Sequence, residues 1–449
     1  MVPPAAVMVD TDKKGVSFIM VKNVLDGLSV LPSPPVVNCK QKAPIVRLND
    51  GLILDDSILE CPTLINGVVG SGKTYLLEQI MFPILKHAEE MNENVFIFCA
   101  KKEMLKFKRP QDIVISVDAT APNACWNIIK EVAVGNNPEL TARDIAKSLT
   151  KDQRSDLQPF FENACNDLLY NSIMAIYEDG LKRGLTYTNW HLCDFLDKVS
   201  LNKDAELSWY DIAKTRPERF NHILDYLGDG LGQGYGIISE IRTLLHDCFF
   251  GSFRSDKGTF SAIETLKSGR KRIFLYYDHS NASEASIKMF KTILNLLLKH
   301  SVDENNDKRT WFFLDEFSLL PRIDIIDSMS LGRGAGFRLV ACLQSAQLMT
   351  RNYKEDEAKA LLSLFPNIIT LKVQDAMSRS IFSDRYGECL TSYTFTSPMQ
   401  EPIHHAEHRK VLSDYEFSLI QNKGDAIMSI PNLSNKPFFY HGFRKELAT

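Results

Sequence analysis

Eight residues, Gly67 to Thr74, read GVVGSGKT and combine glycines, a lysine and a threonine at a spacing suited to phosphate chemistry. In a G-x-x-x-x-G-K-[ST] loop the glycines let backbone N–H groups curl around phosphate oxygens. The lysine reaches the β and γ phosphates, and the hydroxyl holds Mg²⁺. The alternative is a tight glycine turn without a ligand. The predicted phosphate contacts are Gly67, Gly70, Ser71, Gly72, Lys73 and Thr74.

A second stretch, WFFLDEFSLLP from Trp311 to Pro321, leads four apolar residues into two adjacent acids, Asp315 and Glu316. A carboxylate removed from water is destabilising unless it is paired, hydrogen-bonded or bound to metal. One explanation is a helix cap. The other is a strand that neighbours the phosphate-loop strand in a parallel sheet, so that both end at one edge. Asp315 then holds Mg²⁺ through water and Glu316 orients the attacking water.

Two further polar residues, after the two acids in the chain, are candidates for the same site. Gln344 ends the apolar run FRLVACLQ, where an amide can sense the γ-phosphate and its water, or simply cap the strand. Arg333 lies between glycines in LGRGAGFR and is a candidate arginine finger for a neighbouring subunit's nucleotide, with Arg338 in reserve. A surface charge is the simpler explanation of either arginine.

The chain around these motifs alternates short apolar runs with helical periodicity, which predicts a parallel α/β sheet. The predicted strands are TLIN at 63–66, VFIFCA at 95–100, RIFLYY at 272–277, TWFFLD at 310–315, FRLVACLQ at 337–344 and NIITLKV at 367–373. Between residues 138 and 236 apolar residues recur at helical spacing only, so we expect an all-helical insertion that ends at LGDGLGQGYG. The expected domains are an arm or linker at 1–44, a nucleotide-binding domain at 45–137 and 237–449, and the insertion at 138–236.

Composition narrows the class of protein. With 44% hydrophobic and 24% charged residues the 449-residue chain is globular rather than disordered. Its net charge of −4 gives no global basic field, so a nucleic-acid contact requires a local patch or an assembled surface. Nine separated cysteines without a CxxC pair indicate buried free thiols in a reducing cytosol. No signal peptide or membrane span is expected, which indicates a cytoplasmic chain.

Two weaker patterns leave alternatives open. His404 and His408 are four residues apart in HHAEH, which could place two metal ligands on one helical face, although a solvated loop is the simpler explanation. The basic clusters at 101–109 and 267–272 could contact phosphate backbones or form solvated faces.

The motifs together resemble a known family. The order of GVVGSGKT, FFLDEFSLLP, LGRGAGFRLVACLQSAQL and the helical insertion near LQPFFENACNDLL is similar to the TraG/TraD coupling proteins of conjugation and type IV secretion, relatives of the FtsK and HerA motors. The resemblance extends from about residue 45 to 445. It implies a RecA-like P-loop NTPase core with a central, mostly parallel sheet and an inserted all-α domain. It also implies a ring-forming ATPase, usually hexameric, that uses ATP and Mg²⁺.

The expected function is an ATP-hydrolysing motor that translocates or recruits DNA or nucleoprotein through a ring during conjugative transfer. Coupling proteins commonly begin with transmembrane helices, and none is expected here, so a secretion channel, a relaxase-like protein or a separate membrane anchor are candidate partners. Such a partner could recruit the chain to the inner face of the membrane. The alternatives are an ATPase that handles protein substrates, and an ATP-dependent assembly switch in a mobile-element or phage-defence complex.

Overall fold

The computed structural model describes residues 5–11, 17–35, 44–118, 124–150, 159–227, 232–278, 280, 283–303, 309–397 and 400–442. The chain divides into two compact units, one formed by Met1–Ile84 with Val340–Thr449 and the other by Leu85–Leu339. The division falls inside helix α2 (Lys73–Glu90) and inside strand β10 (Phe337–Leu343).

The first unit is built on strand β5 (Thr63–Asn66), which leads into the phosphate loop. Strands β10 and β11 (Asn367–Thr370) pair with β5 in parallel, one on each side. All residues of these three strands are buried, as expected for strands covered on both faces. Two antiparallel strands extend the sheet beyond β11, namely β14 (Ala426–Ser429) and β15 (Phe438–Tyr440).

Several short elements also belong to this unit. They are the antiparallel pair β3 (Pro44–Arg47) and β4 (Ile53–Asp55), and helices α1 (Asp56–Leu59), α13 (Ala346–Met349), α14 (Glu355–Ser363), α15 (Ala376–Asp384) and η5 (Asp414–Ser418).

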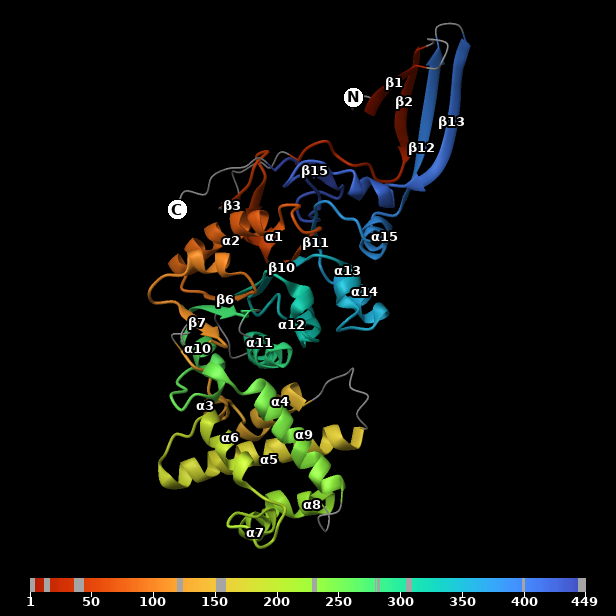
Figure 1. The fold of residues 1–449 in the computed structure, drawn as a ribbon. Helices are drawn as coiled ribbons and strands as arrows, with labels where there is room; N and C mark the ends of the chain where they lie inside the picture. The colour runs from red at the N-terminus through yellow and green to blue at the C-terminus, as the bar shows by residue number, and fades with distance from the viewer. Residues whose placement is uncertain are drawn as a thin grey trace. The chain divides into compact units, whose positions relative to one another are not determined.

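The segment 1–44, expected as an arm or linker, takes part in sheets. Strands β1 (Ala5–Thr11) and β2 (Ser17–Asp26) join β12 (Glu388–Ser397) and β13 (Gln400–Lys410) in the antiparallel order β1-β2-β12-β13 (Figure 1). Leu31 pairs with the start of β15, since its N–H donates to the carbonyl of Pro437, just before the strand, and its carbonyl accepts from the N–H of Phe439. The pairing of β2 with β12 and the bonds of Leu31 to β15 join residues more than 350 positions apart, so the local sequence pattern does not reveal them.

The described residues of the second unit include four parallel strands. Strand β6 (Asn94–Cys99) pairs with β9 (Thr310–Leu314) on one side and β8 (Arg272–Tyr276) on the other, and β7 (Ile113–Ser116) pairs with β8. Aromatic rings fill this sheet, as in the stacked pair Phe96 and Phe312, whose ring centroids are 5.5 Å apart.

Helices make up the rest of the second unit. They are α3 (Ile128–Val134), α4 (Pro138–Thr150), α5 (Pro159–Arg183), α6 (Asn189–Lys198), α7 (Trp209–Thr215), α8 (Pro217–Leu227), α9 (Gln233–Cys248), α10 (Ala262–Ser268), α11 (Ile287–Ser301) and α12 (Ile325–Leu331), with short turns η1 (Lys102–Phe107), η2 (Gly251–Arg254), η3 (Glu284–Ser286) and η4 (Phe317–Leu319).

The glycine-rich stretch expected to end the helical region instead begins a helix. Gly232 is the N-cap residue of α9, which continues to Cys248. A Cβ at Gly234 would lie 2.2 Å from the carbonyl oxygen of Leu227, so glycine allows the start of α9 to pack against the end of α8. Gly234 therefore serves close packing between the two helices.

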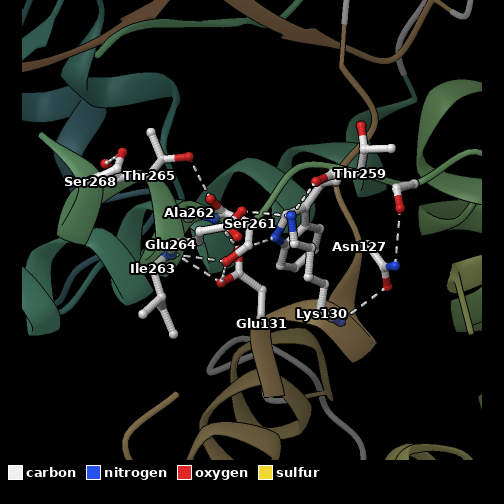
Figure 2. Close-up of polar contacts among 12 residues, drawn as sticks. Asn127, Lys130, Glu131, Thr259, Ser261, Ala262, Ile263, Glu264, Thr265 and Ser268 are labelled. Carbon is white, nitrogen blue, oxygen red and sulfur yellow. Dashed lines mark hydrogen bonds and ion pairs between the residues drawn. The ribbon is translucent and has the colours of Figure 1, made fainter. Parts of the chain in front are cut away.

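A buried carboxylate joins α3 to α10 within the second unit (Figure 2). The side chain of Glu131 is 0% exposed and accepts hydrogen bonds from the indole of Trp126 (2.7 Å), the hydroxyl of Ser261 (2.7 Å) and the N–H groups of Ala262 and Ile263. The last two N–H groups belong to the first turn of α10, so the acid caps that helix from another segment. We call these five residues the Glu131 cluster.

The predicted fold class is confirmed, because parallel α/β strands and a long helical region are both present. All eight cysteines in the described part of the chain are free, and seven of them are buried. His404 and His408 lie on strand β13, so the helical spacing considered for them is wrong. No helix among the described residues is long and apolar enough to cross a membrane.

Candidate nucleotide site

The phosphate loop, residues 67–72, connects β5 to α2 in the first unit. Gly70 and Gly72 have φ angles of 81° and 107°, which L-residues with side chains rarely adopt. A Cβ on Gly70 would point into open space, whereas one on Gly67 would lie 2.8 Å from the Ser71 hydroxyl. The loop thus needs glycine at position 70 for its backbone turn and at position 67 for close packing.

Neighbouring strands fix the start of the loop. The N–H of Gly67 donates to the carbonyl of Leu343 on β10 (3.1 Å), and the N–H of Val68 donates to the carbonyl of Lys372 beyond β11 (2.9 Å). The hydroxyl of Ser71 closes the turn by donating to Val68 O (2.7 Å). Backbone bonds to strand ends on both sides therefore hold the loop over the carboxyl end of β5.

Lys73 lies at the base of this loop and its side chain is buried. Its ammonium donates to the carbonyl oxygens of Gly67 and Val68, the latter at 3.0 Å. These two acceptors are neutral, so a phosphate oxygen would offer the same donors a stronger, charge-assisted partner. Thr74, the next residue of α2, is half-buried.

Polar side chains lie beneath the loop at the ends of the strands. Asn66 and Thr370 are register partners on β5 and β11, and both are 0% exposed. Neither the Asn66 amide nor the Thr370 hydroxyl has a hydrogen-bond partner among the residues that the structure describes. Buried polar groups of this kind usually bind water or a ligand, which fits a polar molecule at this edge of the sheet.

A cavity of about 710 Å³ opens beside the loop. This volume is in the range of small-molecule sites and is large enough for a nucleotide. Its wall combines the loop with three other segments and is rich in amides and lysines. The lining residues are Val68, Val69, Gly70, Ser71, Gln344, Ser345, Leu348, Lys372, Gln374, Asp375, Ile420, Gln421, Asn422 and Lys423.

Gln344, the predicted sensor, shares this cavity with the phosphate loop. It follows β10 directly, and β10 ends level with β5 because Leu343 pairs with Asn66. Sequence reasoning missed Lys372, Gln374 and Asp375, although the end of β11 is the signal that could have revealed them. It also missed the stretch 420–423, for which the local sequence has no comparable signal.

Asp315 and Glu316 belong to the second unit and directly follow β9. They are 2% and 5% exposed. The N–H of Asp315 donates to the carbonyl of Phe98 (3.0 Å), and the hydroxyl of Ser318 donates to Glu316 Oε1 (2.6 Å). Burial, and then the negative charge of Asp315, raise the pKa of Cys99. Both acids are thus buried at a strand end, as predicted, while their meeting with the phosphate loop stays a prediction.

The two arginines of LGRGAGFR differ in exposure. Arg333 lies in the turn between α12 and β10 and is exposed. Arg338 lies within β10, is 4% exposed and donates to the carbonyl of Phe337 (3.1 Å). A guanidinium buried in a strand does not reach a neighbouring subunit, so Arg338 is wrong as the reserve finger and Arg333 stays the candidate.

The chain is similar to known proteins in part of its sequence and in its fold. Residues 237–397 match the family model described as type IV secretion-system coupling protein DNA-binding domain. No curated protein matches the chain in sequence. The family match confirms the predicted resemblance for this part of the chain.

Solved structures extend the similarity to the whole chain. A trigonal form of the bacterial conjugative coupling protein TrwBdeltaN70 in complex with sulphate has a TM-score of 0.74 and 17% identity, and covers 95% of this chain and 96% of its own. The plasmid coupling protein TrwB in complex with ADP and Mg²⁺ has a TM-score of 0.72 and 18% identity, with 95% of each chain covered. VirB4 of Thermoanaerobacter pseudethanolicus has a TM-score of 0.55 and 13% identity, and covers 92% of this chain and 99% of its own. Residues 237–397 therefore match the model of a coupling-protein domain, and the chain as a whole has the fold of the coupling protein TrwB.

Proposed function

We propose that this chain is an ATP-hydrolysing motor of the coupling-protein kind, which moves DNA or nucleoprotein through an oligomeric ring during conjugative transfer. The observation that carries the proposal is the cavity shared by the phosphate loop and Gln344. The similar protein TrwB has been solved with ADP and Mg²⁺ and with the ATP analogue ADPNP. The same ligands suit the loop, the buried ammonium of Lys73 and the unpartnered side chains of Asn66 and Thr370.

Each predicted residue has a separate role in this proposal. The loop N–H groups and Lys73 bind the β and γ phosphates. Thr74 and Asp315 would hold Mg²⁺, which neutralises charge on the phosphate oxygens when bound. Glu316 accepts a hydrogen bond from the attacking water and orients it, and Gln344 contacts the γ-phosphate end of the site.

A ring would place Arg333 against the nucleotide of a neighbouring subunit. Its exposed position in a glycine-flanked turn suits that role, because the guanidinium can reach outward and stabilise charge in the transition state. Wild-type subunits mixed with Arg333→Ala subunits should therefore lose more activity than simple dilution predicts. A strictly proportional loss would count against a trans-acting arginine.

DNA is the cargo we favour, because residues 237–397 match a coupling-protein DNA-binding domain. Steady-state ATP hydrolysis measured with and without single- and double-stranded DNA, over a range of protein concentrations, tests this. We expect stimulation by DNA and a specific activity that rises as subunits associate. Activity that is flat and independent of DNA would favour a protein substrate or an assembly switch. Recruitment to a membrane by a partner stays a prediction.

A further inference from the structure

A segment far along the chain from the phosphate loop lies against it. This segment, Ile420–Gly424, follows η5 and precedes β14. The N–H of Gly424 donates to the carbonyl of Ser71 (2.9 Å), and Ile420 to Lys423 line the same cavity as the loop. We call these five residues the loop-facing segment.

Three glycines set the spacing between this segment and the loop. A Cβ on Gly72 would lie 2.9 Å from the backbone nitrogen of Gly424. A Cβ on Gly442 would lie 2.3 Å from the carbonyl oxygen of Gly424. Contacts below 3 Å to backbone atoms force a displacement, so Gly72, Gly424 and Gly442 stack backbone against backbone. A side chain at Gly442 would push Gly424 although it does not touch the loop itself.

Asp425 fixes the segment from behind. One carboxylate oxygen accepts from the N–H of Gly442 (3.0 Å), and the other accepts from the side-chain amide of Asn422 (2.8 Å). Because β14 and β15 flank these residues and belong to the sheet that contains β5, the segment is attached to the same framework as the phosphate loop.

The side chains of this segment suit the nucleoside part of a nucleotide. Gln421, Asn422 and Lys423 are exposed and line the cavity, while the phosphates are assigned to the loop. An amide both donates and accepts, so Gln421 can bond to ribose hydroxyls or to a base edge. Ile420 adds an apolar surface of the kind that ligand cavities commonly present to a flat ring.

We propose that the loop-facing segment is a nucleotide-recognition element, in which Gln421 contacts the nucleoside and Gly424 and Gly442 are positioning residues for the phosphate loop. The proposal rests on the nucleotide-binding function proposed above and deepens it. A substitution at Gln421 should then weaken the binding only of ligands that contain a nucleoside. Substitutions at the two glycines should weaken the binding of every ligand of the phosphate loop.

The first experiment measures the Kd of ADP and of inorganic pyrophosphate by competition against a fluorescent ADP analogue, using the full chain. Gln421→Ala should raise the Kd of ADP about three- to tenfold, the scale of one lost hydrogen bond, and leave that of pyrophosphate unchanged. Gln111→Ala removes an exposed amide of the second unit and is the matched control. An unchanged Kd of ADP in Gln421→Ala would overturn the nucleoside contact.

The second experiment compares two glycines that both have positive φ. Gly424→Ala adds a methyl group 3.2 Å from Gly442 O, whereas Gly387→Ala meets nothing within 4 Å, and the φ angles are 94° and 68°. Both variants carry similar backbone strain, but only Gly424→Ala, together with Gly442→Ala, should weaken ADP and pyrophosphate alike. If Gly424→Ala and Gly442→Ala bind ADP and pyrophosphate as tightly as Gly387→Ala does, the positioning role is overturned. Thermal unfolding confirms that each variant is folded.

The outcomes separate this inference from the proposed function. If the wild-type chain binds neither ligand, the nucleotide site itself is wrong. If the wild type binds, Lys73→Ala does not, and the Gln421 and glycine variants bind normally, only the recognition element is wrong. Because Gln421 is a surface residue, its variant decides the question even if a glycine variant fails to fold.

Discussion

The phosphate loop and the Glu131 cluster are both polar sites in an apolar framework, but they are built in opposite ways. At Glu131 an acid with no exposed surface receives four hydrogen bonds from one helix start, one indole and one hydroxyl. At the phosphate loop Gly70 faces open space, Val69 is 79% exposed and a cavity lies alongside. The first site is closed by protein donors, whereas the second leaves room for a ligand.

The difference shows how to separate structural from functional polar residues. Both carboxylate oxygens of Glu131 accept hydrogen bonds from protein donors, so the cluster joins two segments of the protein and leaves the carboxylate engaged. Lys73 donates to two neutral carbonyls of its own loop, and a phosphate can replace these acceptors. We therefore expect changes at Glu131 to alter stability and changes at Lys73 to alter binding.

The largest effect should come from Glu131→Ala. The change leaves several buried donors without acceptors, and the free energy of unfolding should fall by about 3–5 kcal/mol. Denaturant unfolding of the full chain measures this. A loss below about 1 kcal/mol would mean that water or neighbouring groups replace the carboxylate, and that the cluster does not anchor α10.

Lys73→Ala should have the next largest effect, on affinity rather than on stability. Loss of a charge-assisted contact to phosphate should raise the Kd of ADP about 10- to 100-fold. Calorimetric titration measures this, and thermal unfolding without ligand should be nearly unchanged. Wild-type affinity in this variant would remove the phosphate-site assignment.

Glu264→Ala should have the smallest effect and sharpens the contrast with Glu131. Glu264 lies in the same helix start, but its side chain is 52% exposed and it pairs with Lys130 at 2.5 Å (Figure 2). An exposed ion pair contributes about 1 kcal/mol or less to stability, so the free energy of unfolding should change little. A loss as large as that of Glu131→Ala would show that burial is not what distinguishes the two acids.

Much of the first unit could be predicted because its signals are local. Strand β5, the glycines of the loop and the start of α2 lie within one short stretch, and β10 and β11 are continuous apolar runs. The placement of Gln344 beside the loop follows from the fact that parallel strands end at one edge.

The rest depends on contacts between distant residues. The donors of Glu131 come from residues 126 and 261–263, and Gly424 meets a loop more than 350 positions earlier. A sequence shows glycines and acids at these positions but not their partners. The pairing of β2 with β12 was missed for the same reason.

The most direct test of the proposed motor is Glu316→Gln, measured for ADP affinity and ATP turnover in the same preparation. The variant keeps the shape of the side chain but loses the base that orients water, so affinity should stay at the wild-type value while turnover falls about 100-fold or more. Turnover at the wild-type rate would contradict the catalytic assignment of Glu316 and, with it, the proposed mechanism of hydrolysis.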